Sequence, residues 1–363
     1  MDSLYLDHAA TTPLLPAARD AMAHGFAIWA NPSSPHRAGR AARAALEEAR
    51  ARVKAALGWQ GEVVFTSGAS EALALAIARS VAPLAAVSAV EHEAVLRPAG
   101  SCPRLAVDAQ GRVDPAAAAL AGLVAVQQVN NETGVIQPLD AIGAAVRDAG
   151  GVLLADCAQG AGKLPLPHAD LIALSAHKFG GPIGVGALLV RDWALLSPTG
   201  GQERGYRAGT ENLPGVLGMA AALEAGDAWM AEARRLRAKL ETALVAAGGE
   251  VVGAGADRLP TIGAVRMPGI SANAQLIRFD AMGIAVSAGS ACSSGSLRTS
   301  HVLEAMGCDN SNEIIRISIG HETIELDIDR FIAAWAGMAQ GKSYGWRPAD
   351  CARLLQSAHG CAP

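Results

Sequence analysis

An acid and an amine, each placed after a candidate strand, carry the clearest chemistry in this sequence. Asp156 ends the run GVLLAD, and Lys178 comes at the end of the strand pattern DLIALSAH. The carboxyl ends of parallel strands meet at one edge of a sheet, where ligands bind, so both side chains are expected to point out of that edge. Such a pair suits pyridoxal phosphate, because the amine can bond to the aldehyde while the carboxylate keeps the ring nitrogen protonated. A structural salt bridge is the commoner role of an Asp–Lys pair and is the alternative.

Lys178 is one of five lysines, and the other four are less suited to this role. Lys54 and Lys239 lie in charged helical stretches, and Lys342 lies in the tail. Lys163 is the competitor, but Gly162 before it and Pro165 after it predict a solvated turn.

A loop of small residues, FTSGASE at 65–71, connects a candidate strand to a candidate helix. The start of a helix presents free backbone N–H groups and a partial positive charge, so this loop predicts a phosphate site. The alternative is an ordinary helix start with a serine cap and Glu71 in the first turn.

Cys292 lies in the Gly- and Ser-rich stretch SAGSACSSG at 287–295. This composition predicts an accessible loop rather than the core, where most free cysteines lie. Accessibility is one requirement for a reactive thiol and a lowered pKa is the other. At this point a reactive and an inert thiol are both open.

Arg316 lies in the candidate strand at 314–319, where alternation puts the three isoleucines at 315, 317 and 319 opposite Arg316 and Ser318. An arginine there can hold a substrate carboxylate with two hydrogen bonds, and a surface arginine is the alternative. His92 lies between two glutamates but in no metal-binding spacing, so we expect no metal held by protein side chains alone.

Short apolar runs alternate with helical patterns up to about residue 200, which predicts an α/β fold with a mainly parallel sheet. Strands are expected at 62–65, 84–89, 123–129, 152–155, 171–175 and 186–190, with helices at 37–56, 70–81 and 142–149. One long helix at about 216–247 is expected next, followed by strands at 262–266 and 314–319 and helices at 272–282 and 326–340. We place a domain change near residue 250, which predicts a large domain of 13–250 and a smaller α+β domain of 1–12 and 251–363.

Composition excludes several classes of protein. The 363 residues are 51% hydrophobic and 18% charged, which predicts a folded chain of two domains. A net charge of −4 gives no basic footprint for nucleic acid. No apolar run reaches the ~18 residues of a membrane span, and the N-terminal sequence is unlike a secretion signal. The six cysteines form no CxxC pair, so we expect reduced thiols and a cytoplasmic location.

These sequence motifs occur together in one chain, in the order that is typical of one protein family. The sequence resembles the cysteine desulfurases of the NifS/IscS-like group, pyridoxal-phosphate enzymes of aminotransferase class V. The resemblance rests on stretches between about residues 4 and 340 that are jointly specific: YLDHAATTP at 5–13, NPSSPH at 31–36, FTSGASE at 65–71, Glu91-His92, VNNETG at 129–134, DCAQ at 156–159, SAHKFGG at 175–181, ERGYRAGTEN at 203–212, SAGSACSS at 287–294 and Arg316. It implies fold type I of the pyridoxal-phosphate-dependent transferases.

The resemblance also implies roles for individual residues. Lys178 would bond to the cofactor aldehyde, Asp156 would face the ring nitrogen, and His92 would stack on the ring and move protons. The remaining cofactor contacts would come from Asn131 and Gln159 at the ring substituents, with Ala69, Ser70, Ser175 and His177 around the phosphate. Thr210 would reach the phosphate of a neighbouring subunit, which implies a homodimer. Arg316 and Asn31 would bind the substrate, and Cys292 would be the nucleophile.

The implied reaction converts L-cysteine to L-alanine and leaves a persulfide on Cys292, whose sulfur passes to an acceptor or scaffold protein for iron–sulfur clusters or other sulfur cofactors. Cys292 can also help to ligate a cluster shared with such a scaffold. Another class V enzyme, such as a selenocysteine lyase or an aminotransferase, is the nearest alternative. A non-catalytic thiol protein that carries iron–sulfur clusters is a further one, although it has no use for Asp156 and Lys178 at strand ends.

The sequence departs from the family pattern at a few positions. Ser70 stands where threonine is frequent, which keeps the hydroxyl, and Ile183 stands where lysine is common. Cys157 follows Asp156 where a small residue is usual, and we expect it to be buried. The tail beyond Gly341 does not resemble the segment with which related proteins dock a scaffold.

Overall fold

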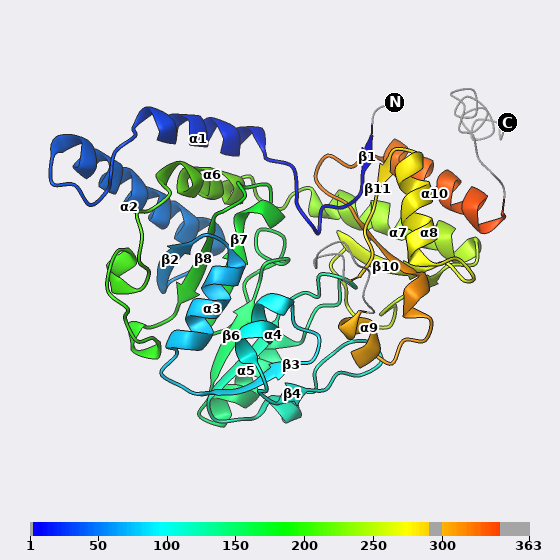
Figure 1. Ribbon diagram of the computed structural model, residues 1–363, viewed down its shortest axis with the longest axis horizontal. Coiled ribbons are helices and arrows are strands. Elements are labelled where there is room, and N and C mark those ends of the chain that lie inside the picture. The colour runs from blue at the N-terminus through cyan, green and yellow to red at the C-terminus, as the bar shows by residue number, and fades with distance from the viewer. Residues whose placement is uncertain (1–2, 290–299, 342–363) are drawn as a thin grey trace.

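The computed structural model describes residues 3–289 and 300–341, which form two parts that lie side by side (Figure 1). The larger part contains a seven-stranded sheet in the order β2-β8-β7-β6-β5-β3-β4. Its strands are β2 Glu62–Thr66, β3 Leu84–Ser88, β4 Arg104–Leu105, β5 Leu123–Gln127, β6 Val152–Asp156, β7 Leu171–Ser175 and β8 Gly186–Val190. Every neighbouring pair is parallel except the two that involve β8. The α/β fold with a mainly parallel sheet is therefore confirmed.

The strand β8 is antiparallel because of the short segment that precedes it. Only residues 176–185 separate β7 from β8, and the first three of them form the 3-10 turn η2 Ala176–Lys178. A parallel return needs a crossover of a dozen residues or more, so a connection of this length reverses the chain. Lys178 consequently lies on a turn beyond the end of β7 rather than on the strand itself.

Helices cover both faces of this sheet. One hydrophobic cluster joins it to α2 Arg37–Leu57, α5 Leu139–Asp148 and α6 Leu213–Glu224, with α1 Pro16–Ala27 outside α6. A second cluster joins the opposite face to α3 Ala69–Arg79 and α4 Glu93–Ala99. Within β6, Leu153 and Ala155 belong to the first cluster and Leu154 to the second. A sheet covered on both faces accounts for the nearly continuous apolar runs in its sequence.

The helices differ from the sequence expectation in four places, one of which is the unexpected five-residue helix α9 His301–Ala305. The single helix expected at 216–247 is two helices, α6 Leu213–Glu224 and α7 Met230–Ala246, and Gly226 between them has a φ of 72° that only glycine adopts freely. The helix α1 was not expected, although Pro16 at its first turn is a typical start signal. The helix α4 has seven residues, which is too short to show a helical period.

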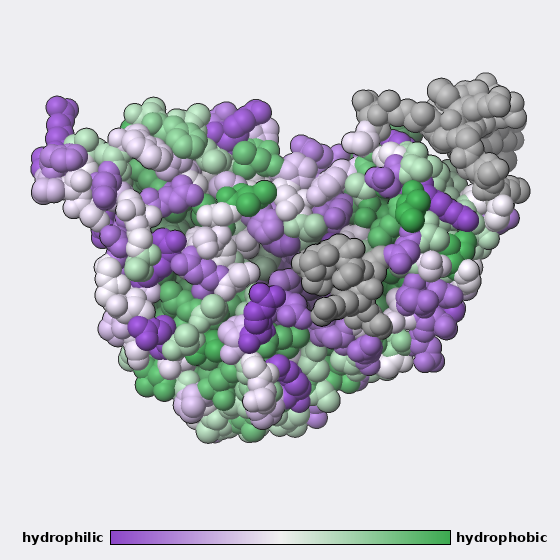
Figure 2. Space-filling view, in the orientation of Figure 1, coloured by the Kyte–Doolittle hydropathy of each residue, from purple (hydrophilic) through white to green (hydrophobic). Residues whose placement is uncertain are grey.

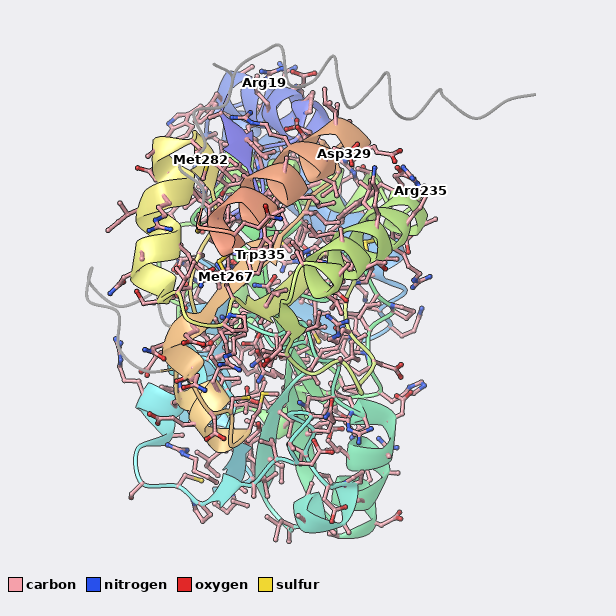
Figure 3. The ribbon with its side chains drawn as sticks, turned by 90° about the vertical axis from the view of Figure 1, so that its right-hand side faces the viewer. Arg19, Arg235, Met267, Met282, Asp329 and Trp335 are labelled. Atoms are coloured by element: carbon pink, nitrogen blue, oxygen red, sulfur yellow. The ribbon has the colours of Figure 1, made fainter. Side chains whose placement is uncertain are left out.

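The smaller part contains the sheet β12-β10-β9 and the parallel pair β1–β11. Its strands are β1 Leu4–Tyr5, β9 Glu250–Val251, β10 Ile262–Arg266, β11 Ile284–Ala285 and β12 Ile314–Ser318, and its helices are α8 Ala272–Ala281, α9 His301–Ala305 and α10 Glu325–Ala339. Figure 3 shows Trp335 and Met267 inside this part, with Arg235 and Asp329 at its outer side. Because α7 adds Leu236, Leu240 and Leu244 to the same core, the exact domain boundaries stay a prediction.

The remaining short elements are the 3-10 turns η1 Pro115–Ala118, η3 Trp193–Leu195, η4 Glu203–Gly205 and η5 Ser311–Glu313. Among the residues that the structure describes, no helix is both long enough and apolar enough to span a membrane. Hydrophilic residues gather over the middle of the face shown in Figure 2, between the two parts.

A buried ion pair anchors the loop that contains Thr210. Both Arg50 guanidinium NH groups donate to the Glu203 carboxylate, at 2.8 and 3.0 Å, and Arg50 also donates to the Val63 carbonyl at 2.6 Å. Glu203 in turn accepts from the Phe65 N–H at 2.9 Å. The side chains of Arg50 and Glu203 are only 5% and 1% exposed, so each charge depends on the other.

Replacing Glu203 by alanine should lower the free energy of unfolding by up to about 3–5 kcal/mol, because the buried Arg50 charge then keeps, among the described residues, only its partly exposed partner Glu47, at 3.1 Å. Denaturant unfolding measures this loss. The matched control is Glu62→Ala, which removes an exposed pair with Arg204 at 2.8 Å and should cost no more than about 1 kcal/mol. Equal losses in the two variants would contradict the assignment.

Candidate active site

A cavity of about 500 Å³ lies at the carboxyl ends of β5, β6 and β7 and at the start of α3. Most of the residues singled out from the sequence line it: Ala69, Ser70, His92, Asn131, Asp156, Gln159, Ser175, His177, Lys178 and Arg316. Asn31 and Thr210 are exposed and do not line this cavity. Cys292 and most of the loop expected at 285–296 lie outside the described residues.

One end of the cavity has the features of an anion site. The helix α3 begins at Ala69 after Gly68, and no side chain caps its first N–H groups. Gly68 has a φ of 152°, and a Cβ there would stand 3.5 Å from Ser175 Oγ, which keeps the approach to the helix start narrow. Ser67 and Ser70 are exposed toward the same end. Free N–H groups, hydroxyls and a helix N-terminus together bind a phosphate well.

His177 lines the cavity as a neutral ring. Burial, with the charges of Lys178 and Lys163, lowers its pKa to about 4. Its Nδ1 lies 2.9 Å from Thr11 Oγ1. In the tautomer in which Nδ1 accepts from that hydroxyl, Nε2 carries the proton and can donate to a ligand.

The N-terminal segment holds the amine of Lys178. Lys178 Nζ donates to the carbonyl oxygens of Ala9 and Ala10, at 2.6 and 2.9 Å. Gln159 Nε2 donates to the same Ala9 carbonyl at 2.9 Å, while the buried Gln159 Oε1 has no hydrogen-bond partner within the part of the chain that the structure describes. The segment is fixed in turn by Ser318 Oγ, which accepts from the Ala9 N–H at 2.9 Å.

Asp156 lies at the buried end of the cavity, next to a second acid that the sequence analysis did not single out. Burial raises the pKa of Asp156, while the Ala158 N–H and the charges of His92 and Lys178 oppose that rise. Glu91 is fully buried, and its pKa is raised well above the ordinary value by burial and by the charge of Asp156. The arrangement keeps Glu91 protonated, so that Asp156 carries the negative charge that faces the cavity.

His92 begins the helix α4, where its ring is oriented by the backbone. Its Nδ1 accepts from the Ala94 N–H at 3.1 Å, which leaves Nε2 as the proton-bearing atom of the neutral ring. The sequence shows that His92 lies between Glu91 and Glu93. It does not show that Glu91 is buried while Glu93 is exposed.

Arg316 is buried on β12 rather than at the surface, with 3% exposure. It donates to the Asp7 carboxylate at 2.7 Å and to the Asn131 carbonyl at 3.0 Å. Among the described residues its buried Nε has no hydrogen-bond partner, and the side chain lines the cavity. A guanidinium held from two sides with donor capacity left over can receive a carboxylate.

Glu132 is a second acid that the sequence analysis did not single out. It lies next to Gly289 and Ser300, the residues on either side of positions 290–299. Glu132 is 4% exposed and accepts from Ser300 Oγ at 2.6 Å. Any side chain at Gly289 would collide with the Glu132 carboxylate. His301 Nε2 lies 2.9 Å from the carbonyl oxygen of Glu91. These contacts join the smaller part to the loops that contain His92 and Asn131.

Lys163 and Cys157 follow β6 in a tight turn. The solvated turn predicted around Lys163 is wrong, because the side chain is only 6% exposed. Backbone hydrogen bonds within 157–164 fold this turn back onto the sheet rather than outward. Cys157 is fully buried, as expected, and burial and the charge of Asp156 raise its pKa well above the ordinary value.

Comparison with known proteins shows to which family this chain belongs. The profile of the Aminotransferase class-V family matches residues 4–331, and the chain belongs to that family. It is 38% identical to a cysteine desulfurase of Cereibacter sphaeroides over 92% of this chain and 94% of that protein. A NifS-like protein from Rickettsia africae is 29% identical, with a TM-score of 0.85 over 93% of this chain and 99% of that one. The structure of SspA in complex with cysteine is 28% identical, with a TM-score of 0.76 over 89% of this chain and 100% of that one.

Pyridoxal phosphate is the cofactor of this family, and the residues present fit it. The cavity of about 500 Å³ lies in the range of small-molecule sites. It offers an anion site at the start of α3, an amine at Lys178, a carboxylate at Asp156 and the unpartnered Gln159 Oε1. This donor set matches a phosphate, an aldehyde and a basic ring nitrogen.

Glu91→Gln should change how stability depends on pH. Because the folded pKa of Glu91 lies above the ordinary value of 4.5, the unfolded chain releases this proton first, and wild-type stability falls as the pH rises above that value, by at most about 1.4 kcal/mol per pH unit. The free energy of unfolding of Glu91→Gln should therefore rise relative to wild type between pH 5 and pH 7. The exposed Glu93→Gln on the other side of His92 is the control and should parallel wild type. Parallel curves for Glu91→Gln would contradict a protonated Glu91.

Proposed function

We propose that this protein is a cysteine desulfurase that removes sulfur from L-cysteine, gives L-alanine and forms a persulfide on Cys292. One observation carries the proposal: Lys178, Asp156 and Arg316 line a single cavity in a chain 38% identical to a cysteine desulfurase over 92% of its length. The structure of a related protein with bound cysteine supports the choice of substrate.

When bound, the cofactor supplies an aldehyde for covalent attachment and a ring that accepts electrons. Ala69, Ser70, Ser175 and His177 would hold its phosphate, and Asp156 would keep the proton on its ring nitrogen. Glu91 is neutral, so the negative charge lies on Asp156 at the buried end of the cavity. That charge would make the proton on the ring nitrogen hard to lose. Asn131 and Gln159 contact the ring substituents.

Lys178 serves first as the point of attachment and then as the base that removes the α-proton of the substrate. Its Nζ donates to the Ala9 and Ala10 carbonyls, and the same contacts would hold the amine when it is not attached to the cofactor. His92, with its proton on Nε2, lies on the wall of the same cavity and moves protons at the ring. Arg316 binds the substrate carboxylate and fixes its orientation.

The thiolate of Cys292 then attacks the substrate sulfur. A sulfur–sulfur bond forms and the carbon–sulfur bond of cysteine breaks, and the electron pair of that bond stays with the carbon skeleton, which takes up a proton and leaves as L-alanine. No external oxidant or reductant is needed. The sulfur is afterwards transferred to an acceptor thiol by the same kind of attack.

The protein is proposed to act as a homodimer. Thr210 and Asn31 are exposed and lie away from the cavity of their own chain, which supports a contact with the neighbouring subunit. The proposed roles of Thr210 at the partner's phosphate and of Asn31 in substrate binding rest on the family pattern. An acceptor or scaffold for iron–sulfur or other sulfur cofactors, a cluster shared through Cys292 and a cytoplasmic location belong to the same proposal.

Incubation with L-cysteine should add one sulfur atom to Cys292, and peptide mass spectrometry checks this. Cys292→Ala should keep the yellow colour of the bound cofactor and lose sulfide release, because only the nucleophile is missing. Cys157→Ala is the matched control and should retain activity, since its thiol is buried. Sulfur found on Cys157, or full activity in Cys292→Ala, would contradict the mechanism and favour a selenocysteine lyase or another class V enzyme.

Arg316→Lys should raise the KM for L-cysteine roughly 10- to 100-fold with a smaller effect on kcat, because about 1.5–3 kcal/mol of charge-assisted binding is lost. Alanine formation at varied cysteine concentration measures both constants. The control is Arg266→Lys on the neighbouring strand β10, where the guanidinium pairs with Glu250 and Glu313. A change in kcat alone would argue against a carboxylate contact.

A further inference from the structure

A second cavity, of about 170 Å³, shares only Lys178 with the cofactor cavity. It lies where the N-terminal segment meets the turn after β6 and the link between α6 and α7. The residues of its wall that matter here are Thr12, Lys163, Lys178, Trp229 and His321. Among the residues that the structure describes, neither an aspartate nor a glutamate belongs to this wall. The proposed function uses no part of the cavity beyond Lys178.

Lys163 brings a buried cation to this wall. Its side chain is 94% buried, since only 6% is exposed. Within residues 3–289 and 300–341 its ammonium makes no hydrogen bond and no ion pair. The backbone of the turn is fixed, because the Lys163 N–H donates to the Gly160 carbonyl at 2.9 Å. The position of Lys163 on this turn is therefore fixed.

The groups around Lys163 increase the cost of its charge. Burial and the charge of Lys178 lower the pKa of Lys163 to about 7. The Lys163 charge in turn helps to lower the pKa values of His8 and His177 to about 4. His321, whose nearest carboxylate is Glu322 at 3.7 Å, adds a further basic group. A buried cation surrounded by basic groups needs a counterion or loses its proton.

The dimensions of the cavity limit what this counterion can be. A water molecule occupies about 30 Å³, so a cavity of about 170 Å³ holds a small ion with a few waters and nothing of the size of the cofactor. One uncompensated ammonium matches a single negative charge. We propose that this cavity binds a small monovalent inorganic anion of halide size, held by Lys163 Nζ.

An anion at this place balances positive charge beside the amine of Lys178. It therefore belongs to the electrostatic environment of the proposed active site without contacting substrate or cofactor. Its binding is a property of the described walls of the second cavity, to which neither Asp156 nor Arg316 belongs.

Bromide is the probe for a direct test. Crystals of the cofactor-loaded protein are grown with tens of millimolar sodium bromide in place of chloride, and anomalous diffraction is collected at the bromine edge. A peak is expected in the cavity within hydrogen-bonding distance of Lys163 Nζ. Lys163→Met should lose it, while Lys239→Met keeps it, because Lys239 forms exposed ion pairs with Glu325 and Asp329.

Thermal unfolding provides the second readout, with sodium bromide compared to sodium gluconate at the same ionic strength. Bromide should raise the Tm of wild type and of Lys239→Met and should leave that of Lys163→Met unchanged. An empty cavity in wild-type crystals, a peak found only at molar bromide, or a peak retained in Lys163→Met would overturn the proposal. The wild-type crystal decides the question even if Lys163→Met fails to fold. None of these measurements uses cysteine turnover, so failure of the proposed desulfurase reaction would leave their outcome intact.

Discussion

The hydrogen bonds from Lys178 Nζ to the carbonyls of Ala9 and Ala10 are the contact on which the rest of the site depends. They place the amine at the meeting point of the two parts, because residues 9 and 10 connect β1 of the smaller part with α1 of the larger one. Gln159 and Ser318 bind the same short segment from opposite sides. The geometry of the lysine is therefore set jointly by the N-terminus, by β6 and by β12.

Around this contact, each pair of neighbouring buried side chains of the same charge type carries only one charge. Where two acids approach each other, at Asp156 and Glu91, burial keeps one of them neutral. Where two amines approach each other, at Lys178 and Lys163, the same physics disfavours a second ammonium. Uncompensated pairs of like charge are costly in a medium of low polarity. The charge at each end of the cofactor cavity therefore has one defined sign.

Much of this architecture follows from local sequence, and the exceptions have physical reasons. The strands at 62–66, 152–156 and 171–175 are apolar runs of strand length, and the acid and the amine that follow the last two do line one cavity. The burial of Lys163 and of Glu91 was not visible, because Gly162 and Pro165 signal a turn without saying which way it faces. The antiparallel β8 and the separation of α6 from α7 did have local signals, namely the ten-residue connection 176–185 and Gly226, but the apolar and helical patterns were weighted above them.

The pairing of β1 with β11 bears on how the protein is made. Leu4 pairs with Ile284, so β1 has to wait, after it leaves the ribosome, for a partner 280 residues further along the chain. Contacts between residues so distant in sequence form late, since a long loop must close before they are gained. The resting place of the lysine at Ala9 and Ala10 can be completed only afterwards, and capture of the cofactor accordingly follows synthesis of nearly the whole polypeptide.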